Sequence, residues 1–164
     1  GPRDAGLFFG SRPSAPDNRG TWMDSKAPPE QLPLIGTVEN PALFHDGTNQ
    51  FLSYEIAPAA GGGIAILRFS HVLHFEKNPV NVEGLAAARY PVSPWNITEI
   101  TGSDRTARWS ALRPRFWTIS FNDVTVEVVF TGMRIAQRTT AAASPATALL
   151  DFLQAKGRDE IAPD

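Results

Sequence analysis

The stretch FWTISFNDVTVEVVF, residues 116–130, decides the fold. If Asn122 and Asp123 form a two-residue turn, the residues on either side become the opposed pairs of an antiparallel hairpin. One face then holds the pairs Phe121/Val124, Ile119/Val126 and Trp117/Val128, and the other holds Ser120/Thr125, Thr118/Glu127 and Phe116/Val129. A shift of one residue would spread the apolar side chains over both faces. The pattern therefore predicts a hairpin in this register, with its apolar face in the core and its polar face in solvent.

A second hairpin is predicted around Asp46-Gly47-Thr48-Asn49, because a four-residue loop there pairs Phe44 with Phe51 and Leu43 with Leu52. A long strand is predicted from Ile64 to Glu76, with an apolar face that is interrupted by His71. Weaker strand patterns cover residues 95–101 and 133–139. Residues 77–90 and 101–114 are expected to be irregular connections.

One helix is predicted near the C-terminus. Ser144 is a suitable N-cap, Pro145 suits the first helical position, and Gly157 is a suitable stop. The helical spacing predicts a buried stripe formed by Leu149, Leu150, Phe152 and Leu153. The expected fold is mainly β, or β-rich α+β: an antiparallel sheet curved into a sandwich or partial barrel, with one C-terminal helix.

The expected organisation is a single β-rich domain over residues 34–157, between a proline-rich arm and an acidic tail. The arm covers residues 1–33 and is expected to be disordered, and its residues 1–22 to be derived in part from a vector, since Met23 opens a natural-looking start. The tail covers residues 158–164.

Composition excludes several classes of function. The 164 residues contain no cysteine, which excludes disulfides and thiol catalysis and fits a cytoplasmic location. A net charge of -2 argues against nucleic acid as the partner, and no apolar run is long enough to predict a membrane span.

No motif of a known catalytic, cofactor or metal site appears, so no catalytic residue, cofactor or metal is predicted. His71 and His74 are three residues apart, which places them on opposite faces of a regular strand and prevents them from sharing an ion. His71 is expected to be a satisfied core histidine, and Glu127 to lie on a solvated face. An alternative site would combine His71, His74 and Glu127. If the polar face of the hairpin were buried, Glu127 would be a stronger candidate for a functional residue.

The sequence feature that most clearly suggests a binding surface is the segment from Arg105 to Trp117. It mixes arginines with aromatic residues and contains no acidic residue. Arginine and tryptophan are typical anchors of protein interfaces, and they also occur in sites for phosphate or single-stranded nucleic acid. The alternative is a solvated loop whose tryptophans belong to the core. The candidate binding residues are Arg105, Arg108, Trp109, Arg113 and Arg115.

The second half of the chain resembles a loose group of small, stand-alone, uncharacterised bacterial β-rich proteins. The resemblance spans about residues 50–131 and rests on IAILRFSHVLHFE (64–76), on SPW (93–95) and on RFWTISFNDVTVEVVF (115–130). In that group the last strand pair resembles H-F-x-x-x-F-x-D-x-x-x-E; Phe121, Asp123 and Glu127 match its end, whereas Arg115-Phe116 replaces the leading histidine. The resemblance implies no established activity, but some such proteins act as immunity proteins or neighbours of toxins.

Three functions follow as hypotheses. The first is a non-enzymatic protein-binding domain, such as an immunity or accessory protein that blocks a protein partner. The second is a half-barrel that binds a small molecule or lipid in an apolar cavity. The third is a hydrolase that uses His71 with a carboxylate, which requires His71 to reach a cleft within hydrogen-bond distance of an Asp or Glu.

Overall fold

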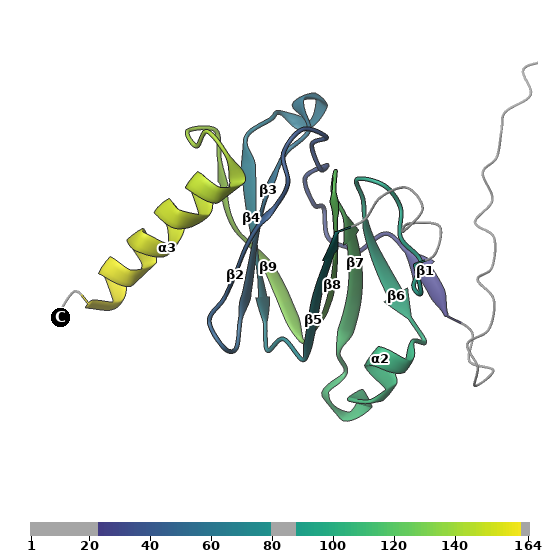
Figure 1. Ribbon diagram of the computed structural model, residues 1–164. Helices are drawn as coiled ribbons and strands as arrows, with labels where there is room; N and C mark the ends of the chain where they lie inside the picture. The colour runs from purple at the N-terminus through teal and green to yellow at the C-terminus, as the bar shows by residue number, and fades with distance from the viewer. Residues whose placement is uncertain (1–22, 80–87, 162–164) are drawn as a thin grey trace, which may run out of the picture.

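The computed structural model describes residues 23–79 and 88–161, which form two antiparallel β-sheets packed face to face and one long C-terminal helix (Figure 1). The five-stranded sheet has the order β1-β6-β7-β8-β5 and the four-stranded sheet the order β2-β3-β4-β9. The strands are β1 (Asp24–Lys26), β2 (Ala42–His45), β3 (Gln50–Glu55), β4 (Ile64–Ser70), β5 (His74–Pro79), β6 (Ile97–Thr101), β7 (Arg115–Ser120), β8 (Val124–Phe130) and β9 (Gly132–Thr139). The helical elements are α2 (Asp104–Ala107), α3 (Pro145–Ile161) and the short 3-10 turns η1 (Pro58–Ala60) and η2 (Ser110–Leu112). The predicted β-rich class is confirmed as a sandwich, and the described strands do not close into a barrel.

Both predicted hairpins have the predicted register. In β7 and β8, Trp117 pairs with Val128 and Ile119 with Val126, and the backbone N–H of Phe121 donates to Val124 at 2.8 Å. In β2 and β3, Phe44 pairs with Phe51 and Leu43 with Leu52 around the four-residue loop. Turn length fixes these pairings together with the apolar pattern, because a slip of one residue would move every side chain of a strand to the other face.

The apolar face of the β7–β8 hairpin lies between the sheets. Trp117 is completely buried and meets Phe69 of β4 and Phe130 of β8 edge-on, with ring centroids 5.6 Å and 5.1 Å away. Side chains from both sheets complete one core. These side chains meet between the two sheets of the described residues.

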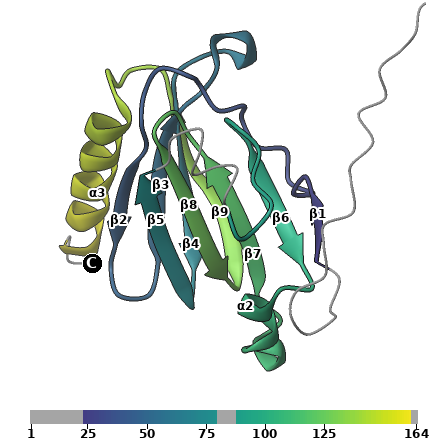
Figure 2. The same ribbon diagram turned by 45° about the vertical axis from the view of Figure 1, so that its right-hand side comes forward.

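The predicted strand from Ile64 to Glu76 is wrong as a single element. The chain turns a corner after Ser70, so that β4 belongs to one sheet and β5 to the other (Figure 2). His71 forms the corner with a φ of 49° and is exposed, which corrects its assignment to the core. Strands of a sandwich pass from one sheet to the other through such bends. An alternating pattern does not reveal the bend, because apolar residues face the core on both sides of it.

The helix α3 covers the outer face of the four-stranded sheet (Figure 1). Ser144 caps it as predicted, since its Oγ accepts from the N–H of Thr147 at 3.2 Å. Leu149 is buried, but Leu150 is exposed, and Ala148 takes the place that was predicted for Leu150. The helix continues past Gly157 to Ile161, which corrects the predicted stop. A glycine within a helix costs about 1 kcal/mol but ends it only where the backbone turns left-handed.

The described part of the proline-rich arm pairs with the sandwich. β1 pairs with β6, and the carbonyl of Pro33 accepts from the buried hydroxyl of Tyr54 at 2.9 Å. A strand of three residues leaves no periodic pattern in the sequence. The predictions for residues 1–22 lie outside the described residues.

The polar face of the β7–β8 hairpin is also covered, contrary to its predicted solvation. Thr118 is only 1% exposed, and its hydroxyl donates to the carbonyl of Pro91 at 2.6 Å. Next to it, Tyr90 packs edge-on against Phe116 with ring centroids 4.8 Å apart. A small second core therefore forms on this outer face of the five-stranded sheet. Glu127 lies beside it, in a partly buried environment that the sequence did not predict.

Candidate functional site

A charged cluster forms where β5 and β8 lie side by side on the outer face of the five-stranded sheet. Glu76 and Glu127 are directly opposed partners in the strand register, so their side chains share this face. His74 precedes Glu76 by two residues and therefore points to the same face. Donor atoms of His74, Glu76 and Glu127 lie within 4.8 Å of one another. We call these three residues with Arg105 the outer-face cluster.

Arg105 reaches this cluster from α2. One Nη atom lies 3.0 Å from Oε2 of Glu76 and 2.9 Å from Oε2 of Glu127, and the other donates to Nε2 of His74. The guanidinium also lies over the ring of Tyr90, with Cζ 5.1 Å from the centroid. The helix is short, but Ser103 caps it by accepting from the N–H of Thr106 at 3.3 Å. Arg105 thus ties a connecting segment to two adjacent strands.

The cluster shifts the pKa values of its members. Burial raises the pKa of Glu127, and the charge of Glu76 adds to this effect while Arg105 opposes it. Burial and the positive charge of Arg105 lower the pKa of His74. The imidazole is therefore neutral near pH 7, and it presents the lone pair of Nε2 to the arginine.

A second ion pair supports α2 from its other side. Asp104 accepts a hydrogen bond from the hydroxyl of Tyr90 at 2.8 Å and pairs with Arg89 at 2.7 Å. Burial and the hydrogen bond to Asp104 raise the pKa of Tyr90 to about 12. Tyr90 is thus held between Asp104 and Arg105, which fixes the start of α2 over the sheet.

The structure does not bring the five candidate binding residues into one surface. Arg105 belongs to the outer-face cluster, whereas Arg115 projects to the opposite face of the sheet. Arg108 stacks on Trp109 at 5.3 Å, and Trp109 packs against the second core. Arg113 is exposed and ends η2 with a φ of 50°.

The side chain of Arg115 makes contacts that support the fold. Its guanidinium pairs with both Glu30 and Glu99, and it lies 5.2 Å from the ring of Trp117. The hydrogen bonds to the two glutamates raise the pKa of Arg115, and the hydrogen bond from Arg115 lowers the pKa of Glu30. This arrangement neutralises the buried Glu99 and ties residue 30 to the sheet.

Of the alternative site, the structure brings His74 and Glu127 together but leaves His71 out. No described carboxylate forms a hydrogen bond or ion pair with His71, so the geometry that the hydrolase hypothesis required is absent from the described part of the chain. Sequence analysis missed Glu76 as a member of the cluster. Two features of the sequence could have identified Glu76: it lies two residues after His74, and both residues fall in the strand predicted from Ile64 to Glu76.

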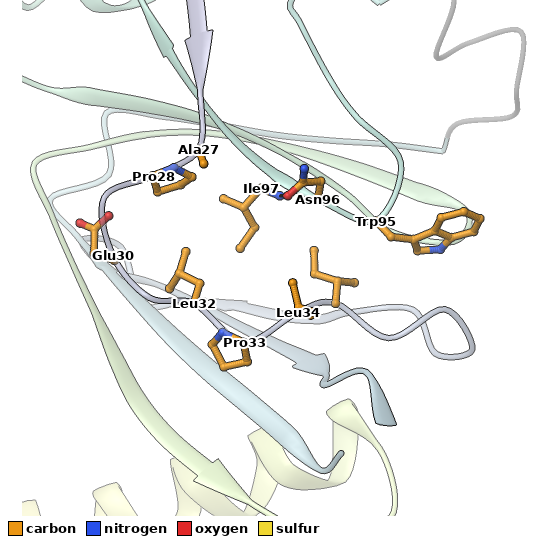
Figure 3. A pocket seen from close by; sticks show the side chains of 10 residues that line it. Ala27, Pro28, Glu30, Leu32, Pro33, Leu34, Trp95, Asn96 and Ile97 are labelled. Carbon is orange, nitrogen blue, oxygen red and sulfur yellow. Dashed lines mark hydrogen bonds between the residues drawn. The ribbon is translucent and has the colours of Figure 1, made fainter. Parts of the chain in front are cut away.

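A pocket lined mainly by apolar residues lies at one end of the sandwich, where residues 27–35 pass from β1 to the end of β3 (Figure 3). Its volume is about 170 Å³. The lining residues are Ala27, Pro28, Glu30, Leu32, Pro33, Leu34, Ile35, Trp95, Asn96 and Ile97. Glu30 and Trp95 lie at opposite ends of this group in Figure 3. We call this hollow the end pocket.

The end pocket has two large exposed apolar side chains at its edge. Leu34 is 63% exposed and Trp95 is 44% exposed. Trp95 follows Pro94 in a turn and has a φ of 48°, a conformation that turns normally give to glycine or asparagine. A left-handed backbone costs a residue with a Cβ about 1–2 kcal/mol. The fold therefore keeps a strained tryptophan in partial contact with solvent, whereas the sequence pattern marks Trp95 only as the start of a strand.

Comparisons of the chain with protein families, with curated proteins and with solved structures gave no match. Within residues 23–79 and 88–161, no helix combines the length and the apolar character needed to cross a membrane.

Proposed function

We propose that this domain is a non-enzymatic protein-binding module, and that it recognises its partner by taking one apolar side chain into the end pocket. The observation that carries the proposal is the small apolar pocket bordered by Leu34 and Trp95. Tryptophan is one of the residue types enriched among those that dominate binding energy at protein interfaces.

The size of the pocket favours a side chain over a whole ligand. Small-molecule sites usually measure about 300–1,000 Å³, whereas an apolar cavity of about 150 Å³ holds a group the size of benzene. At about 170 Å³, the end pocket matches one leucine or aromatic side chain. Its carboxylate, Glu30, is already paired with Arg115, so the pocket presents no unpaired charge that would require an ionic ligand.

Backbone strain supports a role for Trp95 in binding. Strained residues persist where surrounding structure holds them, and they are concentrated at functional sites. Packing in the core does not explain why a tryptophan occupies this turn, because Trp95 is 44% exposed and is not among the core residues. Within this proposal, an immunity or accessory role is the use that the sequence resemblance favours, with the bound partner blocked.

Selection from a random peptide library displayed on phage tests the proposal, because it does not require the partner to be identified first. We expect selection on the purified domain to enrich peptides that share one bulky apolar residue. Fluorescence polarisation with a selected peptide should show a loss of affinity of about tenfold or more for Leu34→Asp, and a similar loss when the shared residue is replaced by alanine.

Phe44→Asp and Leu112→Asp are the matched controls, because these side chains are also large, apolar and exposed but do not line the end pocket. They should leave the affinity unchanged. Peptides that bind Leu34→Asp as well as the unmodified protein, but fail to bind either control variant, would place the binding surface elsewhere and refute the proposal.

A further inference from the structure

Three electron-pair donors converge on one cation in the outer-face cluster. Two are the carboxylates of Glu76 and Glu127, which face each other across adjacent strands, and the third is Nε2 of His74. Like charges directly opposed in a sheet destabilise it unless a cation lies between them. Here the guanidinium of Arg105 supplies that positive charge.

The same three donors suit a divalent metal ion. Ligands that surround one Zn²⁺ in a tetrahedron are about 3.4 Å apart, given bonds of about 2.1 Å. Nε2 of His74 and Oε2 of Glu76 are already 3.5 Å apart, and all three donors lie within 4.8 Å of one another. Small rotations of the glutamate side chains would therefore complete the set. A His-x-Glu pair on one strand, with a glutamate opposite on the next, also places the ligands on a rigid support.

Not every hydrogen-bond donor of the Arg105 guanidinium has a partner. The buried Nε of Arg105 finds no hydrogen-bond partner among the described residues, although the two Nη atoms are engaged. A buried donor without a partner weakens the hold of the cluster on the arginine. The arginine is carried by α2, a helix of only four residues on a connecting segment, and not by either strand of the cluster.

From these observations we propose that His74, Glu76 and Glu127 form a binding site for a divalent transition metal ion, which displaces the guanidinium of Arg105. One imidazole with two carboxylates is a ligand set for Zn²⁺ or Mn²⁺ rather than for Mg²⁺, which prefers oxygen ligands alone. Three protein ligands leave a position open, and His74 and Glu76 are partly exposed, so water can occupy it.

Isothermal titration with Zn²⁺, repeated with Mn²⁺ and Mg²⁺, tests this proposal. The unmodified protein should bind one Zn²⁺, and His74→Ala or Glu127→Gln should weaken binding by about tenfold or more. Arg105→Ala should instead tighten binding by about tenfold, because it removes the cation that competes for the same donors. Mg²⁺ should bind far more weakly than Zn²⁺.

His45→Ala is the matched control, since His45 is an exposed histidine outside the cluster, and it should not change the affinity. In the unmodified protein, NMR signals of the His74 ring and of Arg105 Nε–H should shift together with one equivalent of Zn²⁺, which provides a measurement that does not depend on a variant's folding. Unchanged or weaker binding by folded Arg105→Ala, or NMR shifts confined to His45 or His71, would overturn the proposal.

Discussion

At the scale of single residues, Thr118 shows that both faces of the central hairpin are buried. Replacing it with valine keeps the shape of the side chain but removes the donor to the carbonyl of Pro91. We expect the free energy of unfolding to fall by about 1–2 kcal/mol, because the carbonyl then lacks its partner. Urea denaturation measures this change. Thr101→Val is the control, since Thr101 is exposed at the end of β6 and its replacement should change stability by less than about 0.5 kcal/mol.

Two arginines that the sequence placed in one surface should behave differently. Arg115→Ala leaves the carboxylate of Glu99, which is only 6% exposed, without its cation, and we expect a loss of about 3 kcal/mol of stability. Arg113→Ala removes an exposed side chain and should change stability by less than about 0.5 kcal/mol. Thermal unfolding of the two variants compares them directly, and equal melting temperatures would contradict the structural role of Arg115.

At the scale of elements, the loop between β2 and β3 should give the fold part of its acid sensitivity. Local desolvation tends to raise the pKa of the exposed Asp46, but hydrogen bonds from the N–H groups of Asn49 and Thr48 outweigh it, and the pKa falls to about 2. A carboxyl with a depressed folded pKa stabilises the fold above its unfolded pKa, and this contribution is lost as pH falls through the folded value. Asp46→Ala should therefore be less stable at pH 7, and the difference should narrow between about pH 4 and pH 2. A difference that stays constant over this range in urea titrations would contradict the prediction.

The helix α3 should accept a better helix former at its glycine. A Cβ at Gly157 meets no atom within 4 Å, and the residue lies inside the helix, so Gly157→Ala should raise stability by about 0.5–1 kcal/mol. Gly63 provides the contrast, because its φ is +86° and a Cβ there would lie 2.4 Å from the carbonyl oxygen of Thr139. Gly63→Ala should therefore destabilise the protein. Chemical denaturation of both variants checks the pair, and a destabilised Gly157→Ala would show that helical propensity does not limit this end of the chain.

At the scale of the whole molecule, the strands in which apolar and polar residues alternate were the parts of the fold that could be predicted. The pairing of Ile119 with Val126 follows from alternation together with the two-residue turn at Asn122 and Asp123, because a slip of one residue would move the apolar side chains to the other face. The corner at His71 could not be found in this way, since the strand pattern continues through it. The arrangement of two sheets depends on that corner.

The candidate site could be predicted only in pieces, for a physical reason. The sequence points to Glu127 and His74 separately, but their contact depends on the pairing of β5 with β8, which joins segments about 50 residues apart. Arg105 comes from a third segment without periodicity, and no local rule connects it to either glutamate. The end pocket likewise depends on residues 27–35, whose position is set by β1 and by the bridge between Ile35 and Ile56.

In the end pocket, the strained backbone of Trp95 should lower the stability of the fold, whereas its indole should contribute to peptide binding. Two variants of Trp95 can separate these two effects. Trp95→Ala removes the indole but keeps a Cβ on a left-handed backbone, whereas Trp95→Gly removes both. We expect both variants to lose about tenfold in affinity for a selected peptide. The glycine variant should be the more stable of the two by about 1 kcal/mol, because relief of strain exceeds the entropic cost of glycine at this backbone angle. Denaturation and fluorescence polarisation of the same preparations measure both effects. If the alanine variant were as stable as the glycine variant, Trp95 would not be strained, and if both bound peptide normally, its indole would have no part in recognition.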